Sequence, residues 1–135
     1  MLAKIVILAA GAVLLSPVFS FVQAAEVDLT KLPPASTQAG LTYDKDVKGL
    51  FDQNCIKCHG PAKQKARVRL DSLEAALKGG EHGKVILPGR SAQSPLVHCV
   101  ARLRDDTAMP PKKEGKVLSA EQVGVIRAWI DQGAK

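Results

Sequence analysis

The feature that most constrains this sequence is the run Cys55-Ile56-Lys57-Cys58-His59. Two thiols three positions apart, followed at once by an imidazole, form the C-x-x-C-H pattern of covalent haem attachment. The spacing lets each thiol add to a vinyl group on one edge of the macrocycle, while the histidine presents a nitrogen to the iron. We therefore expect Cys55 and Cys58 to carry one covalent haem c, with His59 as an axial ligand.

The same residue types allow three other interpretations. A thioredoxin-like redox pair places C-x-x-C beside a βαβ unit, and no such pattern is evident here. A structural zinc site would need Cys55, Cys58, His59 and a fourth, distant ligand. A disulfide between the two cysteines would leave the histidine that follows them without a role. Haem attachment is the interpretation that uses all three residues without a further, distant ligand.

The N-terminal segment indicates export. Met1-Leu2-Ala3-Lys4 carries one positive charge, residues 5–22 carry none, and small residues surround Ala24. This order is typical of a secretory signal peptide, so we predict a signal peptide at residues 1–24 and a periplasmic or otherwise exported protein. The alternative is an uncleaved membrane anchor, since the uncharged run approaches the length of a short spanning helix.

Two further segments follow the predicted signal peptide. Residues 25–42 are polar and proline-rich and predict an extended, weakly ordered lead-in, and residues 43–135 form the predicted domain. Beyond residue 24 the chain carries 18 basic and 13 acidic residues. A basic protein can bind an acidic partner, but no motif for nucleic-acid binding is present, so no nucleic-acid partner is expected.

Hydrophobic spacing predicts the first two of four short helices. A helix over residues 44–54 places its apolar residues at positions i, i+3 and i+4 on one face. A second begins at Asp71, which forms a capping-box pattern with Glu74 three residues on. Gly79-Gly80 ends this second helix.

The other two helices also have start signals. Ser94-Pro95 predicts an N-cap followed by proline at the first helical position. Ser119 and Gln122 form another capping box, and the helix they open ends before Gly133. No stretch alternates as a half-buried strand does. We therefore predict a small all-α domain of about four short helices and long loops around one covalent haem.

Met109 is the candidate for the second axial ligand. Met1 leaves with the signal peptide, so Met109 is the remaining thioether, and the Pro110-Pro111 pair that follows stiffens its loop. His82 and His98 are expected to be solvated, with replacement of Met109 as their alternative role. We also expect a carbonyl of the Gly60-Pro61 segment to accept a hydrogen bond from His59.

The remaining reactive and charged residues have less specific interpretations. Cys99 lies on the apolar face of the third predicted helix and is expected to be a buried free thiol. Lys63, Lys65, Arg67 and Arg69 form a basic stretch that is expected to be solvated. Its alternative roles are a docking patch for a redox partner, or an arginine that reaches a haem propionate.

Taken together, these motifs resemble the class I cytochromes c, and most closely the planctomycete-type cytochrome c domain family. The resemblance covers nearly all of residues 42–134. It rests on Tyr43-Asp44-Lys45-Asp46-Val47, Cys55-Ile56-Lys57-Cys58-His59-Gly60-Pro61, Arg69-Leu70-Asp71, Gly79-Gly80, Pro88-Gly89, Ser94 with Leu96, Met109-Pro110-Pro111, Trp129-Ile130 and Gly133-Ala134.

The resemblance implies haem thioethers at both cysteines of the motif and iron ligation by His59 and Met109. It also implies that the first and last helices cross, with Phe51 against Trp129. Gly49 departs from the family, which commonly has proline at this position.

Three functions are compatible with these residues. The first, which we favour, is a non-enzymatic electron carrier that cycles between Fe(III) and Fe(II) and exchanges electrons with redox partner proteins. The second is a haem enzyme or gas sensor from which Met109 dissociates. The third is a metal-stabilised binding module without haem.

Overall fold

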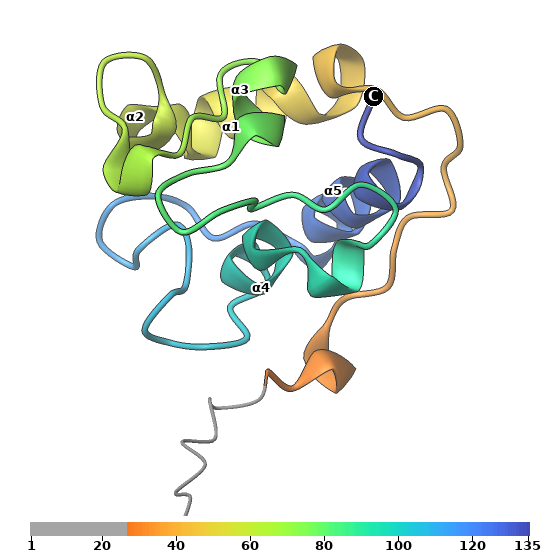
Figure 1. Cartoon of the computed structure of the whole chain (residues 1–135). Coiled ribbons are helices and arrows are strands. Elements are labelled where there is room, and N and C mark those ends of the chain that lie inside the picture. Colours follow the sequence, from red (N-terminus) through yellow and green to blue (C-terminus); the bar gives the residue numbers. More distant parts are fainter. Residues whose placement is uncertain (1–26) are drawn as a thin grey trace, which may run out of the picture.

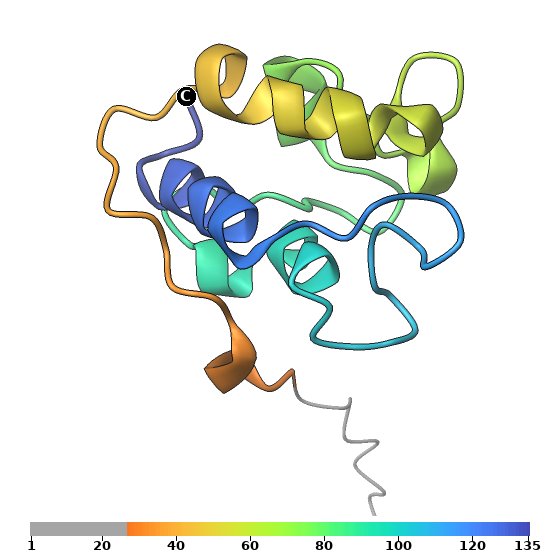
Figure 2. The same ribbon diagram turned by 180° about the vertical axis from the view of Figure 1, so that it is seen from behind.

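The computed structural model describes residues 27–135, so the predicted signal peptide at residues 1–24 lies outside the described part of the chain. Within the described part, short helices are joined by long loops and no strand is present (Figures 1 and 2). The α-helices are α1 (Lys48–Asn54), α2 (Ile56–His59), α3 (Leu73–Lys78), α4 (Pro95–Val100) and α5 (Ala120–Asp131). The predicted all-α class is confirmed. None of these helices is both long enough and apolar enough to cross a membrane.

The first predicted helix forms over slightly more residues than expected. A π-helical turn at Tyr43–Val47 leads directly into α1. Thr42 caps this turn, because its hydroxyl accepts a hydrogen bond from the backbone N–H of Lys45 at 3.4 Å. The wider first turn and α1 together cover the predicted span of 44–54, and both bury their apolar side chains against α5.

The predicted capping box at the start of α5 is confirmed. The hydroxyl of Ser119 accepts from the backbone N–H of Gln122 at 3.2 Å, and the side chain of Gln122 accepts from the backbone N–H of Ser119 at 2.9 Å. These two bonds satisfy donors that a helix leaves free at its first turn. The helix they start buries Val123, Ile126, Trp129 and Ile130.

An aromatic cluster joins the beginning and the end of the domain. The ring centroids of Phe51 and Trp129 are 6.4 Å apart with an interplanar angle of 80°. Tyr43 lies 6.2 Å from Phe51 and 6.1 Å from Trp129. Such tilted and edge-to-face pairs are the favoured arrangements of aromatic rings. The predicted contact of Phe51 with Trp129, between the first and last helices, is therefore present.

The predicted capping box of α3 is wrong. Ser72 caps this helix instead, because its hydroxyl accepts from the backbone N–H of Ala75 at 3.2 Å. The carboxylate of Asp71 is engaged by the guanidinium of Arg69 through two hydrogen bonds of 2.9 and 2.7 Å. A bidentate bond to an arginine is stronger than a single bond to a backbone amide, so Asp71 pairs with Arg69 and the adjacent Ser72 takes the cap.

The lead-in segment runs along α5 and is hydrogen-bonded to it, so it is extended as expected but not loose (Figures 1 and 2). The backbone N–H of Ser36 donates to the carbonyl of Gly124 at 2.9 Å, and Arg127 donates to the carbonyl of Pro33. A β-carbon at Gly124 would lie 2.7 Å from the carbonyl oxygen of Pro34. The glycine therefore allows the two backbones to approach closely.

Candidate haem-binding site

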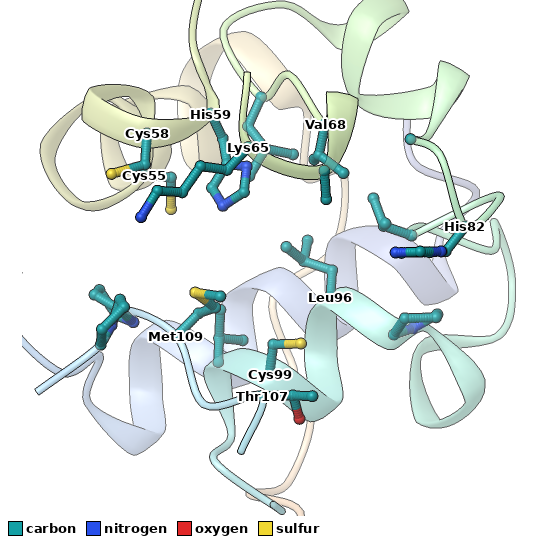
Figure 3. Close-up of a pocket in the computed structure, with 18 of the residues that line it drawn as sticks. Cys55, Cys58, His59, Lys65, Val68, His82, Leu96, Cys99, Thr107 and Met109 are labelled. Carbon is teal, nitrogen blue, oxygen red and sulfur yellow. The ribbon is translucent and has the colours of Figure 1, made fainter. Parts of the chain in front are cut away.

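The last four C-x-x-C-H residues form α2, a single helical turn set off from α1. Cys55 separates the two helices with a backbone φ of −124°, and its carbonyl accepts from the N–H of Cys58 at 3.0 Å and of His59 at 2.9 Å. Gly60 ends the turn, where a β-carbon would collide with the carbonyl oxygen of Ile56. This tight turn directs both thiols and the imidazole toward one side (Figure 3).

That side opens into a cavity of about 400 Å³. This volume is within the range of cofactor and small-molecule sites, which is roughly 300–1,000 Å³. Its walls come from α1 and α2, the loops before and after α3, α4, and the loop between α4 and α5. The apolar and sulfur-containing lining residues are Cys55, Cys58, Ala66, Val68, Leu70, Val85, Pro95, Leu96, Cys99, Val100, Met109, Pro110 and Pro111.

The imidazole of His59 projects into this cavity and forms no hydrogen bond among the described residues (Figure 3). Its Nδ1 is buried without a partner. Burial lowers the pKa of His59, which favours the neutral ring that binds metals. Backbone groups of Val68 and Lys65 oppose part of this shift, although neither hydrogen-bonds to Nδ1.

The expected hydrogen bond from His59 to a Gly60-Pro61 carbonyl is absent, so that prediction is wrong. The chain turns sharply at Gly60, whose N–H donates to the carbonyl of Lys63 at 2.9 Å. The backbone groups that lie beside the ring are instead those of Lys65 and Val68.

Met109 projects into the same cavity from the wall opposite His59 (Figure 3). It lies in the loop that follows α4 and is half-buried. Its backbone N–H donates to the carbonyl of Cys99, in the last turn of α4, at 2.9 Å. The structure therefore brings all four predicted site residues, Cys55, Cys58, His59 and Met109, to one cavity.

The two thiols of the motif are free in this structure, and no disulfide joins them. Burial raises the pKa of Cys55 to about 11, so its thiol is protonated at neutral pH. No group of three or more His, Cys, Asp or Glu side chains converges as a metal site anywhere in residues 27–135. The geometry thus favours neither the disulfide nor the zinc interpretation.

The two histidines outside the motif lie differently from one another. His82 is exposed at the rim of the cavity, with its Nε2 3.3 Å from the carboxylate of Glu81. His98 is half-buried, and its Nε2 is 2.7 Å from the carbonyl oxygen of Ala92. The prediction of a solvated His98 is wrong, because the 3-10 turn at Ser91–Gln93 brings a carbonyl within hydrogen-bond distance of Nε2.

Cys99 is only partly buried, because it lines the cavity on the same wall as Met109 (Figure 3). The sequence placed it on an apolar helix face but did not associate it with the predicted haem. Burial raises the pKa of its thiol, while a hydrogen bond to Thr107 opposes the shift. The sequence signal for this position is the spacing of three residues between Leu96 and Cys99, which puts both on one helix face, and that face lines the cavity.

The basic stretch divides into two parts. Lys65 lines the cavity, and Lys63 and Arg67 beside it are exposed. Arg69 is bonded to Asp71, so it is not free to extend elsewhere. Of the four cations, Lys65 is thus the one at the cavity itself.

These residues fit a c-type haem by their chemistry. An apolar cavity can enclose a flat macrocycle, and two thiols on one wall can bond to its vinyl groups. A nitrogen donor without a competing hydrogen bond stands on that wall, and a thioether stands opposite.

A comparison with protein families gives the same result. The family model of the planctomycete cytochrome C matches residues 55–113, which run from the first cysteine of the motif to just beyond Met109. Neither the curated proteins nor the solved structures include a match to the chain. This family is one of cytochromes c, so the match, together with the C-x-x-C-H motif, supports a covalent haem c as the cofactor. The chain is therefore similar to the planctomycete cytochrome C family over residues 55–113, which include the whole C-x-x-C-H motif and Met109.

Proposed function

We propose that this protein is an exported monohaem c-type cytochrome that carries single electrons, with His59 and Met109 as the axial ligands. The observation that supports this most directly is that His59 and Met109 enter one apolar cavity from opposite walls. When bound, the haem supplies a one-electron Fe(III)/Fe(II) couple.

The residues that line the cavity have defined parts in this function. Cys55 and Cys58 hold the cofactor through thioether bonds, so it is not lost in an extracytoplasmic compartment. Met109 offers a soft sulfur that favours the reduced state and occupies the position where a substrate would otherwise bind. The apolar walls exclude water and thereby raise the energetic cost of the more highly charged oxidised state.

The exposed lysines near the cavity suit electron exchange with an acidic partner protein. Lys57 and Lys65 line the cavity, and Lys63 and Arg67 extend the positive surface. Complementary charge accelerates association without requiring a tight complex, as a carrier needs.

Export rests on the sequence of residues 1–24, which has the order of a signal peptide. It agrees with the chemistry, since c-type haem attachment is proposed for the same chain. Contact with a membrane is expected only if this segment is not cleaved.

The first experiment tests covalent attachment. The full chain is expressed with a periplasmic haem maturation system and run on a denaturing gel, which should stain for haem. The double variant Cys55→Ser/Cys58→Ser should not stain, and Cys99→Ser is the matched control that should. A wild-type band that is colourless, with both motif thiols free, would falsify the haem assignment.

The second experiment tests the sixth ligand. Met109→Ala should abolish the sulfur–iron charge-transfer band, lower the midpoint potential and let CO bind the ferrous protein. His82→Ala and His98→Ala are the controls and should leave all three properties unchanged. If wild-type protein already binds CO freely, the carrier function is wrong and a haem enzyme or gas sensor takes its place.

A further inference from the structure

The loop that carries Met109 runs from residue 101 to residue 119 and contains no regular helix. A thioether is a weak ligand for iron, so its loop must be held in place if the bond is to persist. Backbone bonds anchor the first part of the loop, where the N–H of Met109 donates to the carbonyl of Cys99. The part after Met109 requires a different support.

Arg102 supplies that support. Its Nη1 donates to the carbonyl oxygen of Pro110 at 2.9 Å, one residue beyond Met109. The side chain is half-buried, and it forms no ion pair with any carboxylate among the described residues. A hydrogen bond from a charged donor is stronger than one between neutral groups.

The backbone of Arg102 is unusual and is consistent with this role. Its φ is +56°, in the left-handed region that residues other than glycine seldom adopt. The residue follows the last turn of α4, and its N–H donates to the carbonyl of Cys99 at 3.1 Å. The N–H of Leu103 also donates to the carbonyl of His98 at 3.1 Å, and these two bonds form the Schellman motif, in which the residue after the C-cap is left-handed. The end of α4 thus fixes the backbone from which the guanidinium reaches Pro110.

The far side of the loop packs against the same proline. A β-carbon at Gly115 would lie 2.9 Å from the β-carbon of Pro110. Beyond it, Glu114 approaches Lys57 of the C-x-x-C-H turn at 3.5 Å, but both side chains are largely exposed, so this pair contributes little. Pro110 is therefore held between Arg102 and Gly115, next to the ligand.

We propose that Arg102 is a positioning residue for the sixth ligand: its guanidinium holds the Pro110 carbonyl and thereby keeps the Met109 thioether directed into the cavity. The inference rests on the proposed ligation by Met109. Without the guanidinium, the loop after Met109 loses its charged anchor, and the thioether spends a larger fraction of time detached from the iron.

The test uses the haem-loaded full chain. Arg102→Met removes the donor and the charge but keeps an unbranched side chain. Arg104→Met is the matched control, since Arg104 lies in the same loop but is paired with Asp106 at the surface, with Nη2 2.7 Å from the carboxylate. Arg102→Lys restores the positive charge and a donor.

The readout is displacement of methionine from ferric iron by added imidazole, followed through loss of the charge-transfer band. We expect Arg102→Met to need roughly tenfold less imidazole than wild type, which corresponds to the loss of one charge-assisted hydrogen bond. Arg104→Met should match wild type, and Arg102→Lys should lie between. The midpoint potential should be lowest in Arg102→Met, intermediate in Arg102→Lys, and unchanged from wild type in Arg104→Met. A purely structural role would lower the melting temperature without changing imidazole affinity.

Two failures can be told apart. If wild type lacks the charge-transfer band, or Met109→Ala does not alter it, the proposed ligation itself is wrong. If Met109→Ala abolishes the band while Arg102→Met binds imidazole as wild type does, the positioning role alone is overturned. Should Arg102→Met not fold, Arg102→Gln replaces it, with several-fold tighter imidazole binding as the supporting result and unchanged binding as the refuting one.

Discussion

Two glycines in helices should respond in opposite ways to the same substitution. Gly49 in α1 has nothing within 4 Å of the position of a β-carbon. Gly124 in α5 would bring its β-carbon to 2.7 Å from the carbonyl oxygen of Pro34, which is a backbone atom of the lead-in segment. Replacing each by alanine therefore separates helix propensity from close backbone contact.

The magnitudes follow from these surroundings. Alanine in place of glycine inside a helix stabilises it by about 0.5–1 kcal/mol, and Gly49→Ala should show this gain. Gly124→Ala makes the same gain but forces the lead-in away from α5. Displacement weakens the bonds of Ser36 to Gly124 and of Arg127 to Pro33, which contribute about 0.5–3 kcal/mol each. The net effect at Gly124 should be a loss of about 1 kcal/mol.

Thermal unfolding of the haem-loaded variants measures this difference. The two variants should differ by about 2 kcal/mol, or roughly 8–16 °C in Tm for a domain near 100 residues. Hydrogen exchange of the Ser36 amide should also accelerate in Gly124→Ala only. If both alanines raise the Tm equally, the lead-in does not pack on α5 and is a loose linker, as its composition alone suggests.

Three further predictions concern a helix cap, acid stability and the cofactor. Ser72→Ala should destabilise the domain by about 1 kcal/mol in urea unfolding, whereas an Asp71→Asn change that kept Ser72 would leave the cap intact. The bond to Arg69 holds the pKa of Asp71 below its usual 3.8, so its stabilisation is complete above about pH 4 and is lost as the pH falls through the lowered pKa. Arg69→Gln should therefore reduce the slope of the acid-unfolding curve in that range, and an unchanged slope would contradict the pairing. Haem-free Cys55→Ser/Cys58→Ser protein should unfold without cooperativity, because a 400 Å³ apolar cavity is left unfilled; a sharp two-state melt would show the core to be self-sufficient.

Local patterns in the sequence predicted where α4 and α5 begin, although the hydroxyl of Ser94 bonds to Leu87 and Arg90 and does not cap α4. The side chains of Ser119 and Gln122 each bond to the other residue's backbone N–H, so the capping box forms as the pattern implies. Asp71 also matches a cap pattern, but a guanidinium two residues earlier binds its carboxylate. A local pattern predicts a cap correctly only when no stronger partner lies within reach.

The sequence predicted the four residues that stand out by motif or by residue type, but not the residues whose place depends on tertiary contacts. Cys55, Cys58 and His59 are adjacent in sequence, and Met109 stood out as a lone thioether in a stiff loop. The place of Cys99 in the cavity depends on how α4 faces α2, which hydrophobic spacing does not specify. The role of Arg102 depends on a left-handed backbone turn, which has no sequence signal in a residue other than glycine.

The contact between Phe51 and Trp129 also bears on the order in which the chain folds. In the sequence, all four proposed haem-binding residues lie between Phe51 and Trp129. The contact of these two rings therefore closes a loop of about 80 residues, at an entropic cost of about 4 kcal/mol plus a constant. A haem already bonded to α2 gives α4 an apolar surface on which to condense, and the loop left for α5 to close is then much shorter. We expect attachment to precede docking of α5, so that the C-x-x-C-H turn is still open when the thioethers form. Trp129 is the single tryptophan of the chain, so its fluorescence reports when its side chain becomes buried. This burial should be faster in refolding of the haem-bearing chain than of the haem-free one.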